Sequence, residues 1–98
     1  MIEYTPEATR QVDDLLRYYE ERQRDAAARA LLAALRDAER RIERDPAAGL
    51  PAPRPYPQVV RPGRAWVKAG RYWIVYTITD PPVIAAVFFE TANIPGRL

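Results

Sequence analysis

The hydrophobic and polar positions of the N-terminal half follow one short alternation and then a helical period. Met1 to Tyr4 alternates apolar and polar side chains, which predicts a short strand. After Thr5-Pro6, apolar residues recur at the spacing of an amphipathic helix as far as Glu20 or Glu21. Thr5 is the expected N-cap of this helix and Pro6 its first residue.

A second helical period follows a short polar connection. Its apolar residues are spaced for one face of a helix: Ala27, Leu31, Ala34, Leu35, Ala38 and Ile42. Asp25 is the expected N-cap. We expect the helix to stop near Asp45, because Pro46 disfavours helical geometry in the residue before it. Since the connection is short, the two helices are expected to form an antiparallel hairpin.

The second half of the chain has the pattern of three β-strands after a proline-rich connector. The connector, Pro46 to Pro62, holds six prolines and is expected to be stiff and irregular. Arg64 to Lys68 and Arg71 to Thr79 are expected to pair across a tight turn at Ala69-Gly70. Val83 to Phe89 is almost wholly apolar, which is typical of a central strand covered on both faces. The remainder, Glu90 to Leu98, is expected to be a tail.

This order of elements predicts the fold class. One strand, two helices and three further strands indicate an α+β domain, with the helices on one face of a mostly antiparallel sheet. Within the strand from Arg71, alternation puts Tyr72, Ile74, Tyr76 and Ile78 on one face and Trp73, Val75, Thr77 and Thr79 on the other. A chain of 98 residues has the length of one domain, so we assign residues 1–98 to a single one.

The composition narrows the chemistry. The chain has no cysteine and no histidine, so it lacks thiolate ligands, the commonest metal ligand and the usual general base near neutral pH. We therefore expect no metal and no cofactor. No apolar run approaches the roughly 18–20 residues of a membrane span, and no signal peptide is visible. The expected location is the cytoplasm, without membrane association.

Charge is distributed unevenly between the two halves. Residues 1–45 carry nine Arg and eleven acidic residues, whereas residues 46–98 carry five Arg and one Lys against Asp80 and Glu90. The second half is therefore expected to present a basic face. This footprint is weaker than that of a dedicated DNA-binding domain, so we expect no sequence-specific nucleic-acid binding by the chain alone.

The predicted hairpin from Arg64 to Tyr76 concentrates cations and aromatic residues. Its cations, together with the one just upstream, are Arg61, Arg64, Lys68 and Arg71, and they alternate with Trp66, Trp73, Tyr72 and Tyr76. Such a surface can hold an anionic partner. The tyrosines alternate with Ile74 and are therefore also expected to pack in the core, while the tryptophans are expected either to cover the sheet or to be covered by a partner.

These segments resemble the RelE/ParE superfamily, the toxins of type II toxin–antitoxin systems. The resemblance covers nearly the whole chain and is most specific in Gly70-Arg71-Tyr72-Trp73-Ile74-Val75-Tyr76 with an upstream Arg. Further matching pieces are Thr-Pro-Glu-Ala after the first strand, Leu15-Leu16-Arg17-Tyr18-Tyr19, and Asp45-Pro46 followed by Gly49. The resemblance implies a cytoplasmic toxin in a hetero-oligomer with a cognate antitoxin, whose C-terminal segment wraps it. The expected antitoxin-binding residues are Arg61, Arg64, Trp66, Arg71 and Trp73.

The superfamily divides into gyrase poisons of the ParE type and ribosome-dependent mRNA endonucleases of the RelE type. The long helix hairpin looks more like ParE, so DNA gyrase is the expected target and no bond is expected to be broken. The alternative is an endonuclease whose site would be Arg64, Lys68, Arg71 and Tyr76. Many members carry a His after the last strand, whereas this chain has Phe88-Phe89-Glu90, which argues against His-assisted cleavage. Lys68 could replace it only if its pKa fell from about 10.4 to near 7, at a cost of roughly 4–5 kcal/mol. A third possibility is a non-toxic antitoxin-binding module.

Overall fold

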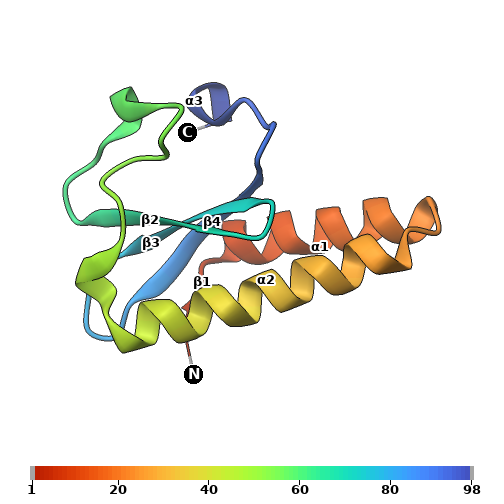
Figure 1. The fold of residues 1–98 in the computed structure, drawn as a ribbon, viewed down its shortest axis with the longest axis horizontal. Helices are drawn as coiled ribbons and strands as arrows, with labels where there is room; N and C mark the ends of the chain where they lie inside the picture. The colour runs from red at the N-terminus through yellow and green to blue at the C-terminus, as the bar shows by residue number, and fades with distance from the viewer. Residues whose placement is uncertain (1, 98) are drawn as a thin grey trace.

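The computed structural model describes residues 2–97 and shows three layers. A helix hairpin lies on one side of a four-stranded sheet, and the connector and the C-terminal segment lie on the other (Figure 1). The elements in chain order are β1 (Glu3–Tyr4), α1 (Pro6–Glu21), α2 (Asp25–Arg44), β2 (Arg64–Ala69), β3 (Tyr72–Thr77), β4 (Val83–Phe89) and α3 (Ile94–Arg97). The α+β class is thus confirmed.

The hairpin begins and ends nearly where the sequence predicts. Thr5 caps α1 by accepting a hydrogen bond from the Ala8 N–H at 3.1 Å. The expected cap of the second helix is wrong, because Arg24 is the N-cap residue of α2 and Asp25 its first helical residue, with no side-chain cap. The tight connection explains the shift: Gln23 has a φ of 53° and the Arg24 N–H already bonds the Tyr19 carbonyl at 2.8 Å. Asp25 instead suits the positive end of the helix dipole.

The turn between β2 and β3 lies one residue later than expected. Ala69 pairs with Tyr72, so Gly70-Arg71 forms the two-residue turn, and Gly70 takes the positive φ of 55°. The β3 strand also ends at Thr77 rather than Thr79. It stops there because β2 begins at Arg64, the partner of Thr77.

The sheet has the strand order β1-β4-β3-β2. β1 runs parallel to β4, and the other two pairings are antiparallel. The prediction of a mostly antiparallel sheet with Val83–Phe89 as a central strand is therefore confirmed. β2 is an edge strand, and it is extended only by a bridge between Leu50 of the connector and Trp66.

A β-bulge in β4 sets which side chains reach the helices. Val75 pairs with Ala86 but Tyr76 pairs with Ile84, so Ala85 has no partner in register. This extra residue places Ile84 and Val87 on the same face, although strict alternation would separate them. Both are buried in the core beneath the hairpin.

The two faces of the sheet have separate cores. The helix face is filled by aliphatic and tyrosine side chains, among them Ile74, Tyr76 and Leu31. The opposite face carries Trp66, Trp73 and Phe88, which Val59 of the connector and Ile94 of α3 cover. The segment expected to be a plain tail thus contains one helical turn, because Ile94 is completely buried against these aromatic rings. Leu98 lies outside the described residues.

Candidate functional site

The four residues of the endonuclease alternative do not gather at one place. Arg64 begins β2 opposite Thr77, whereas Lys68 lies near the other end of β2 opposite Trp73. Arg64 and Lys68 are four positions apart on an extended strand, a distance of about 13 Å. Arg71 lies in the turn at the Lys68 end. The structure therefore brings Lys68 and Arg71 together and leaves Arg64 apart.

Glu90 bridges the two cations at the turn. Its carboxylate accepts a hydrogen bond from Arg71 Nε at 2.6 Å and another from Lys68 Nζ at 3.3 Å. These two cations, Arg71 foremost, lower the pKa of Glu90 below its ordinary value. Glu90 is therefore an ion-pair partner of the candidate cations.

The hydroxyl of Tyr76 is also engaged. Tyr76 is buried on the helix face and donates a hydrogen bond to the Pro46 carbonyl at 2.6 Å. Burial raises the pKa of this phenol above its ordinary value. Tyr76 thus ties the start of the connector to β3, in line with the core packing expected of it.

The two tryptophans are covered by the chain itself. Trp66 is 2% exposed and Trp73 3% exposed. Arg54 of the connector and Lys68 lie over the Trp73 ring, at 5.8 and 5.5 Å from its centre. The connector and the C-terminal segment occupy that face in the free chain, and the expected contact of both rings with the antitoxin stays a prediction. Arg61 and Arg64 are exposed, as a partner contact requires.

An apolar groove that the sequence did not reveal lies between the hairpin and the end of the sheet. It encloses about 730 Å³. Its apolar walls include Leu15, Tyr18, Ala27, Ala30 and Phe89. The apolar helical period of both helices continues beyond the residues that the sheet covers. This continuation is the sequence feature from which the groove could have been predicted. Figure 1 shows the hairpin extending beyond the sheet in this direction.

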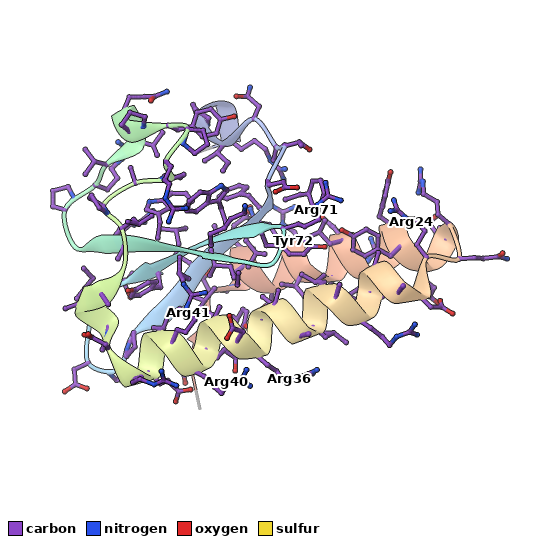
Figure 2. The ribbon with its side chains drawn as sticks, viewed as in Figure 1. Arg24, Arg36, Arg40, Arg41, Arg71 and Tyr72 are labelled. Atoms are coloured by element: carbon purple, nitrogen blue, oxygen red, sulfur yellow. The ribbon has the colours of Figure 1, made fainter. Side chains whose placement is uncertain are left out.

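Two arginines and two tyrosines give the groove its polar groups. Arg24 comes from the hairpin connection and Arg71 from the β2–β3 turn, and both line the groove (Figure 2). Between them, the hydroxyls of Tyr19 and Tyr72 share a hydrogen bond of 2.5 Å. Burial and this bond raise the pKa of Tyr72. The groove therefore combines apolar walls with two cationic side chains and one carboxylate, that of Asp14.

Among residues 2–97, no three His, Cys, Asp or Glu side chains are grouped in a way that would hold a metal ion. None of the helices in this range combines the length and apolar character that crossing a membrane requires.

Comparison with known proteins gives one family. The model of the family described as "ParE toxin of type II toxin-antitoxin system, parDE" matches residues 2–89. This match extends from β1 to the end of β4 and includes both the hairpin and the sheet. A search of curated proteins found none that matches the chain. With nearly all of its length covered by the family model, the chain belongs to the ParE toxins of type II toxin–antitoxin systems.

Proposed function

We propose that this toxin inhibits DNA gyrase through a protein–protein contact and breaks no bond itself. The proposal rests on one observation. The groups that catalysis would need already form hydrogen bonds or ion pairs within the chain. Lys68 and Arg71 pair with Glu90, and the Tyr76 hydroxyl bonds the Pro46 carbonyl. A general base or acid needs a free proton position near a reacting atom. Membership of the ParE family supports gyrase as the target.

We further propose that a cognate antitoxin holds the toxin inactive by filling the apolar groove. An exposed apolar groove of this size is typical of a protein-binding site. Its occupant would be a segment of the antitoxin with apolar side chains toward Leu15 and Phe89, and with acidic side chains at Arg24 and Arg71. Arg61 and Arg64 belong to the other end of β2, so a different part of the same antitoxin segment would meet them.

The test of the target is a supercoiling assay with purified gyrase and purified toxin. Inhibition at micromolar toxin, relieved by the antitoxin, is the expected result. Primer extension on translated mRNA after induction tests the endonuclease alternative, for which new codon-linked cuts would appear. No inhibition of gyrase together with such cuts would overturn our proposal, and unchanged growth on induction would favour a non-toxic antitoxin-binding module.

A further inference from the structure

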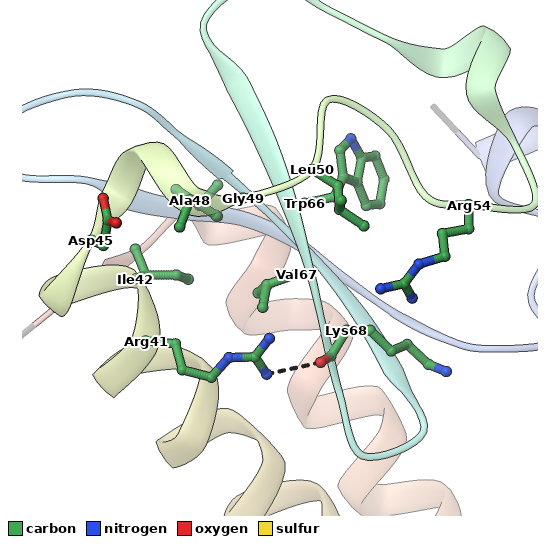
Figure 3. A pocket seen from close by; sticks show the side chains of 11 residues that line it. Arg41, Ile42, Asp45, Ala48, Gly49, Leu50, Arg54, Trp66, Val67 and Lys68 are labelled. Atoms are coloured by element: carbon green, nitrogen blue, oxygen red, sulfur yellow. Dashed lines mark hydrogen bonds between the residues drawn. The ribbon is translucent and has the colours of Figure 1, made fainter.

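A smaller pocket of about 200 Å³ lies at the open edge of β2, where α2 and the connector meet it (Figure 3). Three elements each supply one cationic side chain to its lining: Arg41 from α2, Arg54 from the connector and Lys68 from β2. Asp45 is the only carboxylate in the lining. The lining therefore has a net formal charge of +2.

The backbone at this edge supplies a further donor. Leu50 and Trp66 exchange two hydrogen bonds of 2.7 Å, so the polar backbone groups of Trp66 point away from β3. Alternation in an antiparallel ladder turns the N–H and C=O of Lys68 to the same open side. Arg41 donates to the Lys68 carbonyl at 2.9 Å, as the dashed line in Figure 3 shows, which leaves the Lys68 N–H directed outward beside a guanidinium.

Of the three cations, Arg54 makes the fewest interactions with other side chains. Among residues 2–97 no carboxylate lies at ion-pair distance from Arg54, and its guanidinium lies over the Trp73 ring. Its backbone is nevertheless held in place, because Pro53 is fully buried and the Pro53 carbonyl accepts the Tyr56 N–H at 2.9 Å. Pro55 on its other side further restricts the backbone of Arg54. The backbone that carries this charge is thus held in place before any ligand binds.

The other two cations can be shared with a ligand. Arg41 lies 3.3 Å from Asp37 in an exposed pair of the kind that contributes little. Lys68 is 3.3 Å from Glu90, while Arg71 holds the same carboxylate at 2.6 Å. If Lys68 turned toward the pocket, Glu90 would keep its shorter partner.

We propose that this pocket is a binding site for a phosphate group. Guanidinium groups bind phosphate oxygens through paired, charge-assisted hydrogen bonds. A phosphate monoester carries a charge of about −1.5 to −2 near neutral pH, which matches the lining better than a single carboxylate does. The volume accommodates one phosphate group but is below the roughly 300 Å³ at which pockets enclose a larger ligand. The ligand is therefore free phosphate or the terminal phosphate of a nucleotide whose remainder lies outside.

The test is a titration of the purified protein at constant ionic strength, followed by NMR signals of the arginine Nε–H groups and the Lys68 amide. The probes are inorganic phosphate, adenosine 5′-monophosphate and adenosine. We expect saturable shifts with the two phosphate-bearing probes and none with adenosine. Tighter binding of the nucleotide would identify a terminal phosphate as the ligand, and equal binding would identify the free anion. Absence of saturable binding by both would overturn the proposal.

Variants separate a built site from general attraction to a basic protein. Arg54→Gln is expected to weaken phosphate binding about tenfold or more, since one charge-assisted hydrogen bond is lost. The matched control is Arg64→Gln, an exposed arginine at the other end of β2, which should leave the affinity within about twofold. Equal losses in both variants would contradict the proposal. Neither gyrase nor antitoxin enters this experiment, so its outcome is independent of the proposed function.

Discussion

At Gly49 the backbone passes so close to β3 that a side chain does not fit. A Cβ built there would lie 2.4 Å from the Tyr76 hydroxyl oxygen and 2.7 Å from the Ala65 Cβ. The same hydroxyl bonds the Pro46 carbonyl, so Tyr76 cannot move aside without breaking that bond. Gly49 is thus required by close approach and not by an unusual φ, since its φ is −68°.

We predict that Gly49→Ala destabilises the fold by about 1–3 kcal/mol, the usual cost of overpacking a core. Chemical denaturation measures the free energy of unfolding. In a Tyr76→Phe background the cost should shrink, because the closest clashing atom is gone. An equal cost in both backgrounds would show that the hydroxyl is not the obstacle.

Glu90 links two cations that are far from it in sequence. The pKa of Glu90 is lowered in the folded state, so the pair stabilises the fold above the unfolded pKa of about 4.3. This stabilisation is lost as the pH falls through the lower folded pKa. We predict that Glu90→Gln lowers the melting temperature at pH 7 and that the difference from wild type disappears once the pH falls below the lowered folded pKa of Glu90.

The control for this prediction is Glu21→Gln, which changes an exposed carboxylate for which the described residues provide no ion-pair partner. It should change the melting temperature little at either pH. A gap between Glu90→Gln and wild type that persists unchanged into acid would contradict the ion-pair explanation.

At the scale of elements, α1 completes the hydrogen bonding of β4. The short β1 pairs only with Val83 and Ile84, which leaves the rest of that edge without a strand. Side chains of α1 take its place: Thr5 donates to the Ala85 carbonyl at 2.9 Å, and the amide oxygen of buried Gln11 accepts the Val87 N–H at 2.7 Å. Part of the backbone at this edge of β4 is thus hydrogen-bonded by helix side chains in place of a neighbouring strand.

We predict that Gln11→Leu costs about 1–3 kcal/mol, because the Val87 N–H is left buried without an acceptor. Thr9→Leu, at an exposed position of the same helix, is the control and should cost much less. Hydrogen exchange of the Val87 amide reports the lost bond directly. Unchanged protection of this amide in Gln11→Leu would contradict the assignment.

Periodicity was sufficient to predict the helices and the central strand, because their burial follows one regular face. It did not locate the turn at Gly70-Arg71, because the residue pattern also fits a turn at Ala69-Gly70. The pairing register of β2 with β3 decides between the two turns. The pairing of Glu90 with Lys68 and Arg71 could not be predicted from the sequence either, because it depends on which strands are neighbours in the sheet. The sheet order and the bulge at Ala85 are likewise set by tertiary packing.

At the scale of the whole molecule, the two sides of the sheet differ in what covers them. One side lies under a regular hairpin, whose far end overhangs the sheet and forms the groove. The other lies under irregular chain fixed by Val59 and Ile94 on the aromatic rings. Strand alternation predicts on which face of the sheet the tryptophans lie, but not which segment covers that face. For this reason they were expected at a partner surface. The groove is therefore the surface that we propose for the antitoxin.

We predict that Arg71→Glu weakens the antitoxin complex at least about tenfold, because like charges would face each other at the rim of the groove. Arg24→Glu should act in the same direction without disturbing Glu90. Arg36→Glu, on the outer side of α2 (Figure 2), is the control and should bind as wild type does. Affinity measured by calorimetry, with melting temperatures recorded for each variant, tests this. Equal affinities for all three would refute the groove as the docking site.

The bulge at Ala85 makes this part of the chain sensitive to its length as well as to its composition. Removing Ala85 would retain every apolar side chain around it and would restore an uninterrupted ladder with β3. It would leave Ile84 opposite Tyr76, but it would remove the Ala85 carbonyl that accepts the Thr5 hydroxyl, together with the bend that the bulge gives β4 beside the start of α1. Single-residue deletions here should therefore be rarer among functional variants than substitutions at the same position.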